Sequence, residues 1–174
     1  MERLHQKRET VQAFFAEVAN VRIASEVTAA DVMTPEPECL SIHATALDIV
    51  RKFHATGFRH LLLADEQNRL AGVISDRDVI RCFGMDGAPS SDELQRIRAG
   101  DLMSSDLLTV NSTTPLDRVV GLMVDEGISC VPVLDDGRLV GILTNSDLFI
   151  VLQSLLSLAW SESDEDVAVS ASSL

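Results

Sequence analysis

Apolar residues recur along the chain in two matching series, each beginning with a short extended piece at residues 40–42 or 108–110. A helix should follow each piece, because apolar side chains then recur at the three- and four-residue spacing that gathers them on one helix face. These side chains are Leu47, Ile49, Val50 and Phe53 in the first series and Leu116, Val119, Val120 and Met123 in the second. Each series thus predicts a strand followed by an amphipathic helix.

The ends of these two helices are also marked in the sequence. Thr45 and Thr114 are predicted N-caps, because a threonine hydroxyl can accept a hydrogen bond from a backbone N–H of the first turn. Pro115 would then occupy the first helical position. Gly57 and Gly127 should end the helices, since glycine adopts the left-handed backbone conformation at low cost.

Two short apolar runs follow each helix, and their β-branched residues and turn-like joins favour a β-hairpin. They occupy residues 60–64 and 70–75 in the first series and 130–134 and 139–144 in the second. A second helix should close each series, near residues 76–82 and 145–160. The order of elements is therefore β-α-β-β-α, which is an α+β unit.

The two series are copies of one unit. The segment DVM at 31–33 recurs as DLM at 101–103, and RLAGVIS at 69–75 recurs as RLVGILT at 138–144. The offset between matching positions stays within 68 to 70 residues from end to end. Because a unit of about 55 residues buries too little surface alone, we expect the copies to pack face to face.

Three segments lie outside the copies. An amphipathic helix is predicted at residues 1–26, where Leu4, Val11, Phe14, Phe15 and Val18 share one stripe. The expected organisation is this helix, a first repeat at 27–83, a linker at 84–96, a second repeat with a C-terminal helix at 97–160, and an acidic, flexible tail at 161–174.

Composition and charge narrow the class of protein. The apolar share of 46% is that of a globular protein, and the net charge of −13 argues against nucleic acid or an anionic membrane as partner. The apolar runs are too short to span a bilayer, and the charged start predicts no secretory signal. Three scattered cysteines fit a reducing compartment, so we expect a cytoplasmic protein.

The end of each hairpin combines a hydroxyl with a carboxylate three residues on. Ser75 precedes Asp78 in the first copy, and Thr144 precedes Asp147 in the second. One interpretation is a capping box with aspartate in place of glutamate. The other is a polar binding site at the switch from strand to helix. The pattern alone leaves both interpretations open.

The ordered set DVM, then GISCVPV at 127–133, then GILTNSD at 141–147 resembles a cystathionine-β-synthase (CBS) domain. The two copies resemble a tandem CBS pair, also called a Bateman module, over residues 27–150. The resemblance implies two β-α-β-β-α units packed by pseudo-twofold symmetry through their sheets. It also implies two clefts of a kind that often binds adenosine nucleotides.

The resemblance further implies roles for individual residues. Asp78 and Asp147 would accept hydrogen bonds from ribose hydroxyls, which suits a carboxylate because it only accepts. Ser75 and Thr144 would contact ribose or phosphate. The loops around Thr34 and Ser104 would offer backbone groups to the purine, and Ile42, Val110 and Val131 would sandwich its ring.

An acidic chain needs local cations to bind a phosphate. The first copy offers Arg59, His60 and Arg77, with Arg81 one turn further on, whereas the second has Ser129, Cys130 and Ser146 at the matching places. We therefore expect one phosphate-competent cleft and a second cleft that is weaker or empty. Alternatively, the two arginines at 59 and 77 pair with surface acids, and the histidine is only a strand residue.

Two departures from the family pattern stand out. Leu62 occupies the place where the second copy has Pro132 and the family commonly has proline. The loop MTPEPE at 33–38 is two residues longer than its counterpart up to the following strand. The shape of this strand and the purine contacts of this loop are accordingly open.

The function that these observations favour is that of a stand-alone regulatory module. It would bind an adenine nucleotide such as AMP, ADP or ATP and relay this to an unidentified effector protein or to a homodimer. NAD and S-adenosylmethionine share the same contacts and are not distinguished. The alternative is a dimeric scaffold without nucleotide. An enzyme is not expected, because no catalytic residues, metal ligands or resident cofactor can be assigned.

Overall fold

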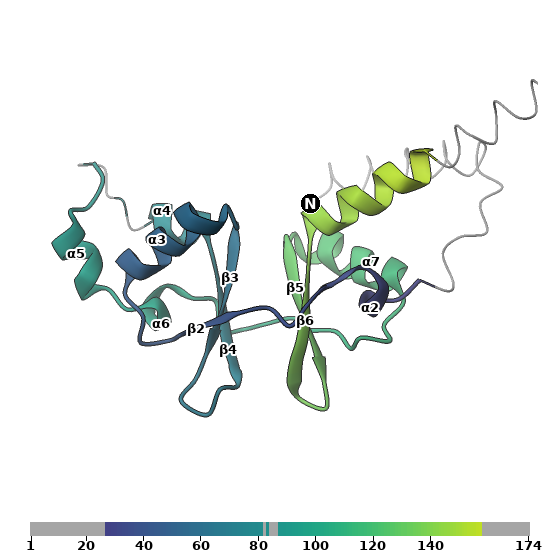
Figure 1. Cartoon of the computed structure of the whole chain (residues 1–174), viewed down its shortest axis with the longest axis horizontal. Helices are drawn as coiled ribbons and strands as arrows, with labels where there is room; N and C mark the ends of the chain where they lie inside the picture. Colours follow the sequence, from purple (N-terminus) through teal and green to yellow (C-terminus); the bar gives the residue numbers. More distant parts are fainter. Residues whose placement is uncertain (1–26, 82, 84–86, 158–174) are drawn as a thin grey trace, which may run out of the picture.

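A computed structural model describes residues 27–81, 83 and 87–157 of the 174-residue chain. Two lobes stand side by side, each with a three-stranded sheet turned toward the other lobe and helices on its outer face (Figure 1). The fold class predicted from the sequence, a tandem α+β pair, is confirmed. The amphipathic helix predicted at 1–26 and the acidic tail lie outside the described residues.

The first lobe is built on a sheet in the order β2-β3-β4. Strand β2 (Cys39–Ser41) pairs in parallel with β3 (His60–Ala64), which pairs antiparallel with β4 (Leu70–Ser75). Helices α3 (Ala46–Thr56) and α4 (Asp76–Arg81) cover this sheet. Buried Ile49, Leu63, Ile74 and Val79 form much of its core.

The second lobe has the sheet order β1-β6-β5. Strand β6 (Arg138–Thr144) pairs antiparallel with β5 (Cys130–Asp135) and with the two-residue β1 (Thr34–Pro35). Helix α7 (Leu116–Glu126) and a helix over residues 145–157 pack outside the sheet. Its core includes the fully buried Val119, Val131, Val133 and Leu143.

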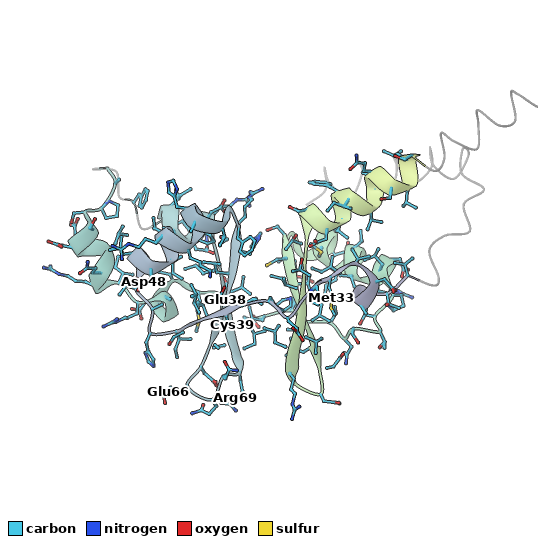
Figure 2. The ribbon with its side chains drawn as sticks, in the orientation of Figure 1. Met33, Glu38, Cys39, Asp48, Glu66 and Arg69 are labelled. Atoms are coloured by element: carbon cyan, nitrogen blue, oxygen red, sulfur yellow. The ribbon has the colours of Figure 1, made fainter. Side chains whose placement is uncertain are left out.

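The leading segment of each repeat packs on the opposite lobe. Helix α2 (Ala29–Val32) and β1 open the first repeat but contact β6 of the second lobe. Helix α6 (Ala99–Leu102) opens the second repeat but contacts β4 of the first lobe. Figure 2 shows Met33 beside the second lobe and Cys39 beside the first. This reciprocal exchange ties the two lobes together.

Between the two repeats stands the linker helix α5 (Ser91–Arg96), which precedes α6 along the chain. Its buried Leu94 packs with Ala46 and Leu47 of α3. Among the described residues, every helix is too short or too polar to cross a membrane.

The predicted helix ends are confirmed at three of four positions. Thr45 Oγ1 accepts from the Asp48 N–H at 3.2 Å, and Gly57 and Gly127 have left-handed φ values of 69° and 67°. The prediction for Thr114 is wrong by one residue, because α7 begins at Leu116. The prediction for Pro115 is wrong as well, since Pro115 is the N-cap and not the first helical residue. The Thr114 hydroxyl instead accepts from the Asn111 N–H at 3.1 Å, which closes the preceding turn.

The two sheets meet through a small apolar cluster. Its buried members are Leu62, Val73 and Ile142, and partly buried Cys39, Leu70, Leu107, Cys130 and Leu139 pack around them. Because this cluster takes side chains from both sheets, neither lobe buries its inner face alone. Beside this cluster the two lobes leave a cavity, close to the end of β4 and the start of β5.

Candidate functional site

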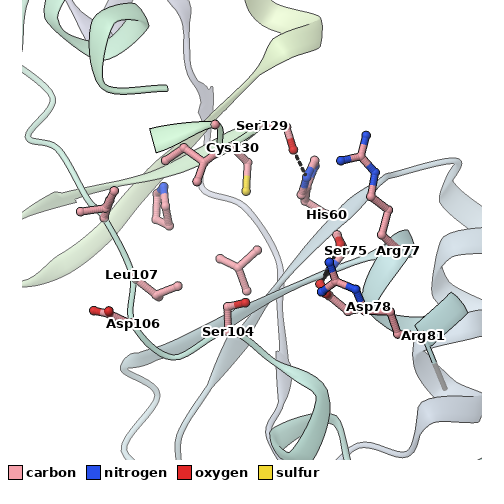
Figure 3. A pocket seen from close by; sticks show the side chains of 15 residues that line it. His60, Ser75, Arg77, Asp78, Arg81, Ser104, Asp106, Leu107, Ser129 and Cys130 are labelled. Atoms are coloured by element: carbon pink, nitrogen blue, oxygen red, sulfur yellow. Dashed lines mark hydrogen bonds and ion pairs between the residues drawn. The ribbon is translucent and has the colours of Figure 1, made fainter. Parts of the chain in front are cut away.

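A cavity of about 280 Å³ lies between the two lobes (Figure 3). The first lobe lines it with His60, Val73, Ser75, Arg77, Asp78 and Arg81, and the second with Ile128, Ser129, Cys130 and Pro132. The loop after α6 adds Ser104, Asp106 and Leu107. Charged and hydroxyl groups from α4 and the end of β4 gather at one end, and the Leu107 side chain lies at the other.

Asp78 is the carboxylate at the polar end. Its Oδ2 accepts hydrogen bonds from the Ser75 N–H at 2.8 Å and the Ser75 hydroxyl at 2.6 Å. Its Oδ1 lies 2.9 Å from Nη1 of Arg81, and only 15% of the Asp78 side chain is exposed. The capping pattern read from the sequence is thus present, and the carboxylate that makes it also lines the cavity.

Local folding explains where this carboxylate points. Strand β4 ends at Ser75 and α4 begins at Asp76, so Asp78 is the third residue of the helix. A side chain at that position reaches back over the first turn, toward the residue that precedes the helix. The end of the hairpin and the start of α4 therefore hold the Asp78 carboxylate in one place.

Two arginines and a histidine lie beside Asp78. Arg77 and Arg81 both line the cavity, and Arg81 is 78% exposed. The ring Nε2 of His60 lies 2.8 Å from Ser129 Oγ in a hydrogen bond that joins the two lobes. Burial lowers the pKa of His60 below its usual 6.5, against the nearby negative charge of Asp76. His60 is accordingly neutral at pH 7 and available as a donor or acceptor.

Much of the remaining wall of the cavity is apolar and consists of Val73, Leu107, Ile128 and Pro132, while the carboxylate of Asp106 lies beside Leu107 (Figure 3). Such a surface suits a flat ring, since apolar side chains can lie against both of its faces. The cavity thus offers an acceptor, cations and an apolar wall within one enclosure.

Cys130 lines the same cavity as a free thiol. Burial, with a smaller effect from the negative charge of Asp78, raises its pKa to about 12. A thiol with this pKa is protonated at neutral pH and is a poor nucleophile. Within the described residues, no group of three or more His, Cys, Asp or Glu could hold a metal ion.

Five of the residues expected from the sequence meet in this cavity. They are His60, Ser75, Arg77, Asp78 and Ser104. The backbone of Ser104 is already paired with Val73, since its N–H donates at 2.9 Å and its carbonyl accepts at 3.0 Å. A purine would therefore find backbone groups beyond Ser104 in this loop.

Arg59 is not among the residues that line the cavity. Its Nε lies 3.4 Å from Asp76 Oδ2, and 64% of its side chain is exposed. The alternative interpretation of this arginine, pairing with a surface acid, is the arrangement in the structure.

The three apolar residues expected to sandwich a ring are also placed elsewhere. Val131 is fully buried in the core of the second lobe, Val110 packs against that core, and Ile42 packs against the core of the first lobe. Each of the three packs with the core of its own lobe, and none is among the residues that line the cavity. The structure thus does not bring them to this cavity.

Thr144 and Asp147 reproduce the local geometry in the second repeat. Asp147 Oδ2 accepts from the Thr144 N–H and hydroxyl, both at 2.7 Å. Neither residue lines the cavity described above. Thr34, the counterpart of Ser104, pairs with Ile142 of β6, two residues before Thr144 at the end of that strand. In the second repeat, these residues occupy the positions that correspond to the polar end of the cavity in the first.

Sequence reasoning missed the apolar wall and treated Ser129 only as a place without a cation. Ile128, just after α7, and Pro132, in β5, reach the cavity from the second lobe, and Leu107 reaches it from the loop after α6. One signal was present: Ile128 and Ser129 follow the glycine that ends α7, as Phe58 and Arg59 follow the glycine that ends α3.

Comparison with known proteins bears on these features. A family model described as "CBS domain" matches the chain twice, at residues 29–84 and 99–154. An uncharacterized protein of Methanopyrus kandleri is 32% identical over 127 residues, which covers 72% of this chain and 60% of that protein. The chain spans 30% to 60% of the length of the first three curated relatives it matches.

Solved structures share the arrangement of the two lobes. A putative acetoin utilization protein (AcuB) from Vibrio cholerae is 27% identical, with a TM-score of 0.66 over 78% of this chain and 96% of that one. The cytosolic domain of the Mg²⁺ channel MgtE, solved in complex with ATP, is 30% identical, with a TM-score of 0.58 over 74% of this chain and 50% of that one.

Proposed function

The chain belongs to the CBS-domain family, and from that premise we propose that it is a regulatory module that binds an adenine nucleotide in the cavity between its lobes. The observation that carries this proposal is Asp78, a carboxylate only 15% exposed that lines a cavity with cations at its side and an apolar wall opposite. These are the groups that a ribose, a phosphate and a flat base require.

A nucleotide would lie along the cavity from its polar to its apolar end. Its vicinal ribose hydroxyls would donate to Asp78, with Ser75 beside them. Its phosphate would lie near the guanidinium of Arg77, which supplies the local positive charge that a chain of net charge −13 needs to attract an anion, and near the neutral His60, which can donate a ring N–H. The base would pack against the apolar wall. The nucleotide is a regulatory ligand here and not a cofactor.

The relative with a bound nucleotide supports this assignment. The MgtE cytosolic domain, 30% identical to this chain, was solved in complex with ATP. The same kind of ligand fits the groups gathered at the cavity, although the triphosphate is one of several adenine nucleotides that share them. AMP is the smallest of these and is the probe of choice for a cavity of about 280 Å³.

A weaker second site is proposed at the equivalent position of the second repeat. Asp147 reproduces the carboxylate, but Ser146 stands at the place of Arg77 and Cys130 at the place of His60. Without the charge of Arg77 and the ring donor of His60, the phosphate would gain fewer and weaker hydrogen bonds. Two equal sites in a calorimetric titration with AMP would contradict this part of the proposal.

Regulation through this cavity needs a change between the lobes. A ligand shifts a conformational equilibrium only when it binds one state better than the other. Because the cavity takes residues from both lobes, a bound nucleotide would favour one spacing of the lobes. An effector protein or a second copy of the chain would sense that spacing.

The effect of replacing Asp78 tests the proposal. Each hydrogen bond to a charged group is worth about 1.5–3 kcal/mol, so Asp78→Ala should weaken AMP binding roughly ten- to a hundredfold in isothermal titration. Asp117→Asn, on the outer helix α7, is the matched control and should bind AMP like the wild type. Equal affinity of Asp78→Ala and wild type would refute the site.

A second candidate function is a dimeric scaffold, favoured by an exposed apolar helix face. Phe149 is 67% and Leu152 49% exposed on the helix over residues 145–157, and Ile80, at the matching place in α4, is 59% exposed. We propose that a second copy covers these residues, because a twofold contact would bury the matching face of both repeats at once.

A thermal shift separates the two candidates, and light scattering tests the dimer that both allow. A ligand at 100 times its dissociation constant adds about 2.7 kcal/mol of stability, so a thermal shift with AMP, ADP, ATP, NAD or S-adenosylmethionine supports the regulatory module. No shift with any of them favours the scaffold. Light scattering should give a dimer mass that Phe149→Glu with Ile80→Glu reduces to the monomer, and a monomeric wild type would contradict the dimer.

A further inference from the structure

Arg81 holds the carboxylate that the ribose would use. We propose that this ion pair makes the cavity selective for phosphorylated nucleosides, because Arg81 exchanges Asp78 for the phosphate when the ligand enters. This inference rests on the proposed nucleotide site and names the class of ligand it accepts. Figure 3 shows Arg81 beside Asp78 and Ser75 at the polar end of the cavity.

Both oxygens of Asp78 are engaged before any ligand arrives. Oδ2 accepts from the N–H and the hydroxyl of Ser75 at 2.8 and 2.6 Å, and Oδ1 lies 2.9 Å from Nη1 of Arg81. These three donors use most of the roughly four lone-pair sites of the carboxylate, so the two hydroxyls of a ribose diol can both donate to Asp78 only if one of these donors leaves.

Arg81 is the donor that can yield. The Ser75 N–H belongs to the backbone at the end of β4, so it stays in place while the fold persists. Arg81 lies at the end of α4 with 78% of its side chain exposed, so its guanidinium can turn away from Asp78 into solvent. Because water reaches the Arg81 end of this ion pair, the pair is screened and its arginine is easily exchanged.

The exchange is favourable only with an anionic ligand. A phosphate close to Arg81 would give the guanidinium a new partner, and a paired geometry with two parallel N–H···O bonds is available to it. A bare nucleoside offers no such partner, so it would have to separate Arg81 from Asp78 without compensation. The cavity would thus bind AMP more tightly than adenosine, and the difference in affinity would exceed the part that the phosphate gains from its contacts with Arg77 and His60.

The second repeat serves as an internal comparison. Asp147 has the same two contacts with Thr144, at 2.7 Å each, but Ile150 stands at the place of Arg81. The contact between Arg81 and Asp78 is therefore particular to the first repeat, and the carboxylate takes its position without it.

Calorimetric titration of the full chain with AMP and with adenosine tests the inference. The wild type should bind AMP at least about tenfold more tightly than adenosine. In Arg81→Gln, AMP affinity should fall roughly tenfold, while adenosine affinity should stay level or rise up to about fivefold. Arg81→Lys should retain part of the selectivity, and Arg96→Gln, on the linker helix α5, should match the wild type.

The outcomes separate this inference from the proposed function. If the wild type binds AMP and Arg81→Gln keeps the same preference for AMP over adenosine, the role of Arg81 is overturned and the nucleotide site stands. A parallel loss of both affinities overturns it as well, since Arg81 would then only support the fold of the cavity. If the wild type binds neither compound, the proposed function fails, and the inference with it.

Discussion

His60 and Ser129 join the two lobes through their side chains, with 2.8 Å between His60 Nε2 and Ser129 Oγ. His60 begins β3 of the first lobe, and Ser129 directly precedes β5 of the second. Both line the cavity, so the bond spans the space between the lobes at the proposed phosphate end. This hydrogen bond therefore links the stability of the packed lobes to the cavity in which the nucleotide is proposed to bind.

Removing this bond should lower stability without unfolding either lobe. Ser129→Ala leaves His60 without its partner hydroxyl, and a hydrogen bond of this kind contributes about 0.5–1.5 kcal/mol. Urea unfolding should show a loss of that size. Ser105→Ala, an exposed residue, is the control and should change stability little. An equal loss in the two variants would show that the bond between the lobes contributes nothing measurable.

Stability should also fall as the solution becomes acidic. Burial lowers the pKa of His60 below 6.5, so the unfolded chain takes up this proton at a higher pH than the folded chain does. The difference favours unfolding from about pH 6.5 downward, until the lower pKa of the folded chain is passed. Above pH 6.5 both states are neutral at His60 and the contribution is constant.

His60→Gln isolates this effect. Urea unfolding of the wild type between pH 8 and pH 5.5 should show stability declining below about pH 6.5, and the variant should show a shallower decline. The lowered pKa values of Asp48 and Asp65 act at lower pH, below their usual 3.8, so they do not account for the difference. Identical pH profiles would remove His60 as the cause.

The packing of the first leading segment on β6 makes one glycine intolerant of a larger side chain. A Cβ at Gly141 would collide with the side chain of Met33, which packs there from the first repeat. Gly141→Ala should therefore cost about 1–3 kcal/mol through overpacking. Gly121→Ala in α7 is a matched control, because a Cβ there meets nothing within 4 Å and alanine favours a helix.

The two glycine variants should differ in sign. Gly121→Ala should leave stability unchanged or raise it by up to about 1 kcal/mol, as measured by thermal or urea unfolding. Replacing Met33 by alanine in the Gly141→Ala background should recover part of the loss, since it removes the colliding group. Similar stability of the two single variants would contradict the close contact between the leading segment and β6.

Cys130 should react slowly with alkylating reagents in the folded protein. Its pKa of about 12 leaves almost no thiolate at pH 8, and the thiolate is the reactive form. Site-resolved mass spectrometry should show its alkylation to be much faster in urea than in buffer. Adding AMP should slow it further, because Cys130 lines the proposed site. Equal rates in urea and in buffer would contradict its burial.

Local signals in the sequence are enough to predict most of the secondary structure. Thr45 and Gly57 bound α3 because each acts through the backbone beside it. Thr114 fails because two adjacent residues compete for one role, and Pro115, with its φ of −56°, becomes the residue before the helix. Such competition depends on the turn before the helix, which local spacing does not show.

The candidate site was predictable where one repeat builds it and not where two lobes meet. Ser75 and Asp78 lie three residues apart on one turn, so their contact follows from spacing. Val131 was misplaced because a strand with apolar residues on both faces does not reveal which face meets the helices, and it is fully buried. Pro132 reaches the cavity only through the packing of β5 opposite the first lobe.

A crystal structure of the full chain with AMP tests the central claim most directly. The account predicts one well-occupied ligand in the cavity, with ribose hydroxyls within hydrogen-bond distance of Asp78, its phosphate beside Arg77, and the guanidinium of Arg81 turned from Asp78 to the phosphate. AMP bound elsewhere, or bound here with its ribose away from Asp78, would contradict the account.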